Sequence, residues 1–274
     1  MGHWTLDDIN WTAFDARKAD PDTVRIIKAA SLVEHNGDVY GRYLANVFEG
    51  DEDFVAAAHQ WAREEVQHGV ALARWANLAD PDWDFEAARR RFNSGYEQVD
   101  LERESSVRGS RCAELIARCI VEVGTSSYYS ALADSTDEPV LKEICKQIAA
   151  DEFRHYKLFY EHMKRYKADE AINLVRRIKV AIGRMAEGED DELAYAYYAA
   201  NNIEGPYDRK ACAAAHGSRA LTRYQPGHIK LATNMTMKAI GLKPQSKMGS
   251  WFARVVWRLF DWRRDRMVRH APAF

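Results

Sequence analysis

Two stretches of the chain carry a glutamate and a histidine three residues apart within an apolar pattern. Glu65 and His68 lie in "AREEVQHG", and Glu152 and His155 lie in "AADEFRHY". On a helix, side chains at this spacing share one face, and a further acid directly precedes each glutamate. In a single pair of this kind, the side chains are usually exposed to solvent, or the histidine is buried with its hydrogen bonds satisfied. The metal-binding hypothesis therefore depends on the repetition.

The two pairs belong to a repeated layout. Glu34 precedes Glu65 by 31 positions, and Glu122 precedes Glu152 by 30. Antiparallel helices joined by a short loop would place the members of each pair opposite one another. The 57 positions between Glu65 and Glu122 leave room for a long crossover, which predicts an all-α, ferritin-like four-helix bundle. Asp38, one turn beyond Glu34, is an alternative to it.

The rest of the sequence also favours helices. Period-2 alternation is scarce, and long stretches are rich in Ala, Leu, Glu, Arg and Lys. We predict helices at 20–48, 53–78, 85–92, 101–134, 140–166, 169–187, 190–201, 208–223, 226–240 and 250–268. Residues 1–240 are predicted to form the ferritin-like domain with additional C-terminal helices, and 241–274 a basic amphipathic helix.

Carboxylates that face a core need compensation. An unpaired buried carboxylate costs several kcal/mol, and several together repel one another. Cations at the centre remove both problems. One glutamate from each of two helices plus Glu-x-x-His from each of the other two is the ligand set of di-iron and di-manganese carboxylate proteins. Oxygen-rich ligation with one imidazole per ion favours iron, with manganese as the alternative.

The stretch "WAREEVQHGVALARWANL" (61–78) resembles the first di-iron motif of the soluble acyl-carrier-protein desaturases, W-x-x-E-E-x-x-H-G-x-x-L. "IAADEFRH" (148–155) resembles their second motif, and "EVGT" (122–125) their E-x-x-T. The resemblance covers about residues 30–165. It implies six iron ligands: Glu34, Glu65, His68, Glu122, Glu152 and His155.

The same resemblance implies roles for three further residues. Glu64 would accept a hydrogen bond from the far ring nitrogen of His155, and Asp151 one from that of His68. Both acids precede a ligand by one position and therefore point about 100° around the helix, towards a neighbouring helix. Thr125 would lie beside the oxygen-binding face and assist proton delivery.

The implied function is an O2-dependent di-iron desaturase acting on a fatty acyl or lipid chain. The first helix, "VEHNGDVYGRYL", is closer to the aldehyde-deformylating oxygenases, so hydroxylation, N-oxygenation or aldehyde deformylation of another substrate stays open. A ferroxidase or iron-storage protein is the alternative of a different class. The four cysteines form no metal-ligand cluster, which indicates that electrons come from an external donor, a ferredoxin or a reductase.

Charge and composition indicate the partners. The net charge of −2 argues against nucleic-acid binding, yet residues 238–269 hold nine Lys or Arg against two Asp. An amphipathic helix at 250–268 with Trp and Arg suits a membrane surface, and its basic face suits an acidic carrier protein that holds the acyl substrate. No signal peptide or transmembrane stretch is evident, so the expected location is cytoplasmic, with peripheral membrane contact and a homodimer both open.

Overall fold

The described part of the chain, residues 3–96, 101, 103–188 and 191–271, forms helices and contains no strand in this computed structural model. Short 3-10 turns occupy the first residues and end at Lys18. The helices are α1 (Pro21–His35), α2 (Gly37–Val47), α3 (Glu52–Ala79), α4 (Phe85–Gly95), α5 (Arg111–Ser135), α6 (Pro139–Glu170), α7 (Leu174–Gly188), α8 (Glu192–Ala200), α9 (Arg209–Ala220), α10 (Pro226–Ala239) and α11 (Lys247–His270).

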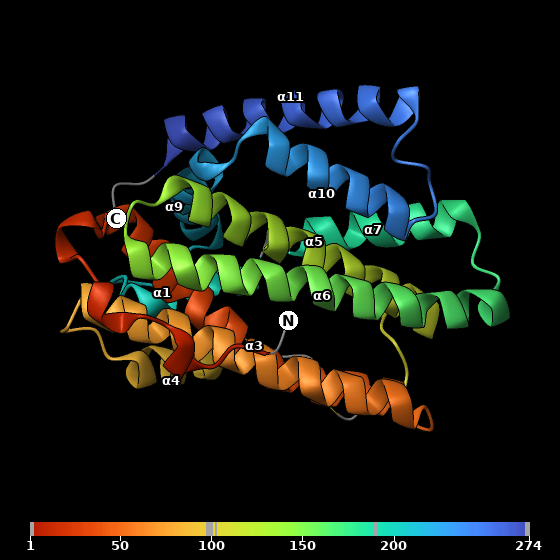
Figure 1. Ribbon diagram of the computed structural model, residues 1–274, viewed down its shortest axis with the longest axis horizontal. Helices are drawn as coiled ribbons and strands as arrows, with labels where there is room; N and C mark the ends of the chain where they lie inside the picture. Colours follow the sequence, from red (N-terminus) through yellow and green to blue (C-terminus); the bar gives the residue numbers. More distant parts are fainter. Residues whose placement is uncertain (1–2, 97–100, 102, 189–190, 272–274) are drawn as a thin grey trace.

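Four helical rods form the bundle. The α1–α2 rod packs against α3, α5 packs against α6, and α3 contacts α6 across the middle. The connection from α3 to α5 is long and contains α4 (Figure 1). This is a ferritin-like four-helix bundle with one long crossover, so the predicted fold class is confirmed.

The first predicted helix, 20–48, is divided in the structure. Asp20 caps its start by accepting from the Thr23 backbone N–H, but the helix stops at His35 and α2 begins at Gly37. The Asn-Gly pair at the division has poor helix propensity. The Asn36 side chain also donates to Glu192 of α8, 3.0 Å away, which holds the junction in place.

The helix predicted at 101–134 begins later than expected. In the structure α5 starts at Arg111, and the side chain of Ser110 accepts from the Ala113 backbone N–H as its cap. Gly109 just before it has φ of +78°, a left-handed conformation that ends any preceding helical run. Residues 103–110 are therefore part of the crossover, while Leu101 is a turn and residue 102 lies outside the described part of the chain.

The apolar core is split into two clusters by a polar layer at mid-height. One cluster gathers Leu32, Leu72 and Leu132 with their neighbours, and the other gathers Leu44 and Leu115 with theirs. Each rod contributes to both clusters. The glutamates and histidines singled out above occupy the helix turns between the two.

Two glycines bring the first rod close to α3 at this polar layer. A Cβ on Gly37 would lie 2.3 Å from the Glu65 Cβ, and a Cβ on Gly69 would lie 2.5 Å from the His35 backbone nitrogen. Neither approach tolerates a side chain, so glycine at both positions sets the separation of the helices where the site is built.

The later helices cover one side of the bundle. α10 packs on α5, and α11 packs on α9 and α10. In Figure 1 α11 runs along the outer edge of the molecule, beyond α10. Within the described residues, every helix is either too short or too polar to cross a bilayer.

We expect Gly37→Ala to lower the free energy of unfolding by about 1–3 kcal/mol, because the added methyl forces α2 away from Glu65. Gly124→Ala is the matched control: it also lies inside a helix, but a methyl group added there would meet no neighbouring atom within 4 Å. It should leave stability unchanged or raise it. Thermal and denaturant unfolding measure both, and equal effects would contradict the close-approach explanation.

Candidate metal centre

The six predicted ligands all lie in the polar layer between the two apolar clusters. Glu34 lies on α1, Glu122 on α5, and one Glu-x-x-His pair on each of α3 and α6. No residue among them is more than 7% exposed. Their ligand atoms form two groups that could each hold an ion, within 4.8 Å of one another: Glu34, Glu65, His68 and Glu152, and Glu65, Glu122, Glu152 and His155.

Each group contains one histidine, and Glu65 and Glu152 belong to both. The Nδ1 atom of His68 lies 3.2 Å from Glu152 Oε1 and 3.6 Å from Glu34 Oε2. Ligand atoms placed at right angles about 2.1 Å from one ion lie about 3 Å apart. The separations around His68 are therefore those of atoms that surround a common ion.

The second group has the same geometry around His155. Its Nδ1 atom lies 3.1 Å from Glu65 Oε1, 3.6 Å from Glu122 Oε2 and 3.9 Å from Glu152 Oε2. With Glu65 and Glu152 in both groups, the arrangement offers two adjacent ion positions with two carboxylates between them.

These atoms converge without hydrogen-bonding one another. Seven buried atoms of the six residues have no hydrogen-bond partner: Glu34 Oε2, Glu65 Oε1, His68 Nδ1, both Glu122 carboxylate oxygens, Glu152 Oε1 and His155 Nδ1. Buried polar atoms are rarely left unsatisfied, and here they point at shared positions. A pair of cations would satisfy them all, so the residues fit a di-iron site.

The pKa values show the cost of this arrangement. Burial and the charge of Glu152 raise the pKa of Glu122 to about 8, and burial with Glu152 and Glu34 raises that of Glu65 well above its usual value. Burial lowers the pKa of His155, but the neighbouring carboxylates of Glu122 and Glu152 outweigh it and raise the value overall. Protons held among these carboxylates are the ones that metal ions would replace.

The far nitrogen of each histidine meets a carboxylate from the opposite helix. His68 Nε2 lies 3.0 Å from Asp151 Oδ2, and His155 Nε2 lies 2.8 Å from Glu64 Oε2. A carboxylate accepts, so each Nε2 donates, and in the neutral imidazole that binds a metal ion the Nδ1 lone pair faces the centre. These are the contacts that the family resemblance implies for Glu64 and Asp151, and they orient both rings.

The N-terminal segment contacts Asp151 and Glu64, the two carboxylates that accept from the histidines. Sequence patterns did not indicate these contacts. Trp4 Nε1 donates to Asp151 Oδ2 at 2.8 Å, and its indole stacks on the His68 ring with an interplanar angle of 3°. His3 Nδ1 lies 2.9 Å from Glu64 Oε1. The great separation along the chain left no spacing signal for these contacts.

Two hydroxyls on α5 reach the centre. Thr125 Oγ1 donates to Glu152 Oε2 at 2.5 Å, and Tyr129 Oη donates to Glu34 Oε1 at 2.6 Å. Thr125 thus lies beside the cluster. Tyr129 follows Glu122 by seven residues and shares its helix face, a signal that could have indicated its contact.

The alternative ligand Asp38 lies outside the centre. Its side chain is 58% exposed and lies 3.5 Å from Arg42, whereas Glu34 is buried inside the first group. The four cysteines are buried with free thiols, and neither group includes one.

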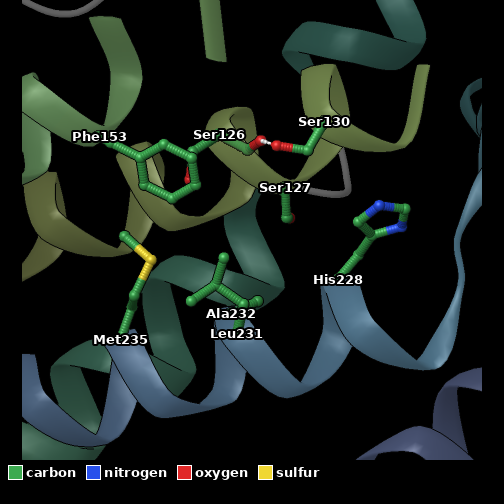
Figure 2. A pocket seen from close by; sticks show the side chains of 8 residues that line it. All are labelled: Ser126, Ser127, Ser130, Phe153, His228, Leu231, Ala232 and Met235. Carbon is green, nitrogen blue, oxygen red and sulfur yellow. Dashed lines mark hydrogen bonds between the residues drawn. The ribbon is translucent and has the colours of Figure 1, made fainter. Parts of the chain in front are cut away.

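A small recess opens on the side of α5 away from the centre. Figure 2 shows its walls, which come from α5, α6 and α10 and include Ser126, Phe153 and His228. Its volume of about 10 Å³ holds about one water molecule. This recess is therefore no site for an acyl chain.

Comparison with known proteins supports the interpretation of the cluster. A family model described as Rubrerythrin matches residues 115–216, a region that contains Glu122, Glu152 and His155. A search of curated proteins found no match. The family match supports a ferritin-like di-iron protein, and it does not confirm the acyl-carrier-protein desaturase family.

We expect the wild-type chain to hold about two iron ions, and both Glu122→Ala and His155→Ala to hold about one, because each residue belongs to only one of the two groups; elemental analysis after anaerobic loading measures this. Removing one of four donors at an ion lowers its affinity strongly. Glu114→Gln is the control, since Glu114 is a buried carboxylate on α5 outside both groups. Full metal content in His155→Ala would contradict this ligand set.

The metal-free protein should reveal the buried carboxylates through pH. Glu122 has its folded pKa raised to about 8, so the folded state keeps a proton that the unfolded state releases near pH 4.5. Stability relative to Glu122→Gln should therefore fall as pH rises from about 5 to 8. Chemical unfolding of both metal-free proteins across this range measures the difference. A difference that stays constant with pH would contradict the buried position of Glu122.

Proposed function

We propose that this protein is an O2-dependent di-iron oxidoreductase that desaturates a fatty acyl or lipid chain. The observation that carries the proposal is the pair of four-residue groups that share Glu65 and Glu152. When bound, two ferrous ions supply the reduction of O2 that makes removal of hydrogen from an unactivated C–H bond possible.

The protein's own residues hold and protect the centre. Asp151 and Glu64 orient the two histidines, and the apolar clusters above and below keep bulk water away from the layer. Excluding water strengthens the interactions of the carboxylates with bound cations. These are the contributions that a protein makes to chemistry carried by a metal centre.

Thr125 is the residue we assign to proton handling. Its hydroxyl donates to Glu152, a carboxylate shared by both groups, and can pass a proton to this position from the outside. The E-x-x-T spacing that relates Thr125 to Glu122 also supports the desaturase proposal, together with the motifs around Glu65 and Glu152.

The proposed reaction needs two electrons from an external donor. An acyl chain loses two hydrogen atoms from neighbouring carbons as a C=C bond forms. O2 takes up these hydrogens, two electrons and two protons, and leaves as two water molecules. In this proposal a ferredoxin or a reductase supplies the electrons, and the acyl chain is presented free, in a lipid or on a carrier protein.

The direct test supplies iron-loaded protein with O2, ferredoxin, its reductase and saturated acyl chains, and analyses the products by gas chromatography and mass spectrometry. We expect monounsaturated chains. Hydroxylated chains would replace desaturation by hydroxylation, and chains shortened by one carbon from a fatty aldehyde supplied in a parallel assay would replace it by aldehyde deformylation. Iron oxidation with no organic product for any acyl carrier would instead indicate a ferroxidase.

Thr125→Val should keep both irons but lower the yield of product per O2 consumed by about 10-fold, since the side chain that donates to Glu152 is lost. Ser130→Ala is the control, because its hydroxyl donates only to the Ser126 carbonyl at 2.7 Å. Parallel oxygen-electrode and product measurements give the ratio. An unchanged ratio in Thr125→Val would contradict its assigned role.

A further inference from the structure

The last helix, α11, has an inner face that is occupied and an outer face that is not. Ala253 is 5% exposed, the rings of Phe260 and Tyr224 lie 5.1 Å apart, and Met267 packs against Gly217 of α9. These contacts fix the rotation of the helix about its axis. Phe260 therefore points inward and away from the outward-facing Trp251.

Large apolar side chains follow the outer face. Trp251 is 58% exposed, Leu259 61% and Trp262 59%. Residues 251 and 262 are about 16 Å apart along the axis at 1.5 Å per residue. Within the described chain, α11 carries more exposed large apolar residues than any other helix, and exposed apolar side chains gathered on one face mark an interaction surface.

Arginines alternate with these apolar side chains. Arg258, Arg266 and Arg269 are exposed on the same face, and the Arg266 guanidinium lies 5.8 Å from the centre of the Trp262 ring. Asp265 is also exposed on this face and Asp261 lies on its flank, and both pair with Arg264, so the three arginines outnumber the one carboxylate there. The outer face therefore presents positive charge beside its tryptophans.

We propose that the outer face of α11 binds the surface of a membrane that contains anionic phospholipid. Tryptophan rings settle at the level of the lipid headgroups, and arginines on the same face attract anionic lipids. In Figure 1 no other helix of the described residues lies outside α11, and the exposed tryptophans show that its outer face is open to solvent.

Two other occupants fit the face less well. A second copy of the chain would bring like charges together across the interface, because both faces carry the same arginines. An acidic protein would match the arginines but would need a recess for each of three protruding side chains on one convex helix. Lipid headgroups rearrange around such side chains, so the membrane surface accommodates both features.

The test is sedimentation of the full-length, iron-loaded protein with vesicles of phosphatidylcholine alone and of phosphatidylcholine with phosphatidylglycerol. We expect binding to the mixed vesicles only, weakened by salt. Replacing Arg258, Arg266 and Arg269 by Gln should lower the partition coefficient on the order of 100-fold. Trp251→Ala with Trp262→Ala should lower it on the order of 10-fold.

Control variants on other faces show whether vesicle binding depends on this surface or on the overall charge and hydrophobicity of the protein. Replacing the exposed Arg90, Lys146 and Lys157 by Gln removes the same charge from other faces, and Leu78→Ala with Val107→Ala removes two other exposed apolar side chains. Both should bind as the wild type does. Circular dichroism and iron content confirm that every variant folds.

Three results would overturn the proposal. The first is wild-type protein that stays in the supernatant with mixed vesicles. The second is a concentration-dependent dimer that Trp262→Ala dissociates, which would assign the face to a second copy. The third is a purified acidic acyl carrier protein that binds this face while the vesicles do not. Because vesicle binding is measured without turnover, its outcome is independent of the proposed reaction.

Discussion

Burying four carboxylates and two imidazoles at one level of a helical bundle is the constraint on which the rest of the structure depends. Such a layer repels itself and leaves polar atoms unsatisfied unless cations enter it. The seven partnerless atoms of these six residues all face the centre, while their remaining polar atoms that have partners are bonded outward to other side chains. The partnerless atoms therefore mark the positions for ions, and the hydrogen-bonded atoms hold the same side chains in place.

The fold serves this layer from above, below and outside. Each rod runs from one apolar cluster to the other and directs its ligand side chains to the centre only in the layer between the two clusters. Glycine at 37 and 69 lets the first rod approach α3 at that height. Outside, the reciprocal contacts of Asp151 with His68 and of Glu64 with His155 tie α3 to α6, and Trp4 covers one of them.

Periodicity made the bundle and the site's main residues predictable. The two Glu-x-x-His pairs and the near-equal distances to Glu34 and Glu122 depend only on helix geometry and hairpin length, which local sequence carries. The match of motifs also implied partners for Glu64 and Asp151, and each lies beside the histidine named for it. For Thr125 it named no partner, and the structure places its hydroxyl beside Glu152. Their chemical roles remain proposals.

What the sequence did not reveal depends on contacts between distant segments. Trp4 reaches Asp151 across 147 positions, and no local pattern encodes such a pairing. The division at Asn36 depends partly on Glu192 of α8, and the late start of α5 on the turn at Gly109. For α11, hydrophobic spacing alone could not distinguish the side that packs on α9 and α10 from the side that stays exposed.

The most direct test of the central claim is a crystal structure of iron-loaded protein with anomalous diffraction recorded at the iron absorption edge. The account predicts two iron peaks roughly 3.5–4 Å apart. The carboxylates of Glu65 and Glu152 should contact both iron ions, and one iron should lie nearest His68 and the other nearest His155. A single peak, or iron bound away from these six residues, would contradict it.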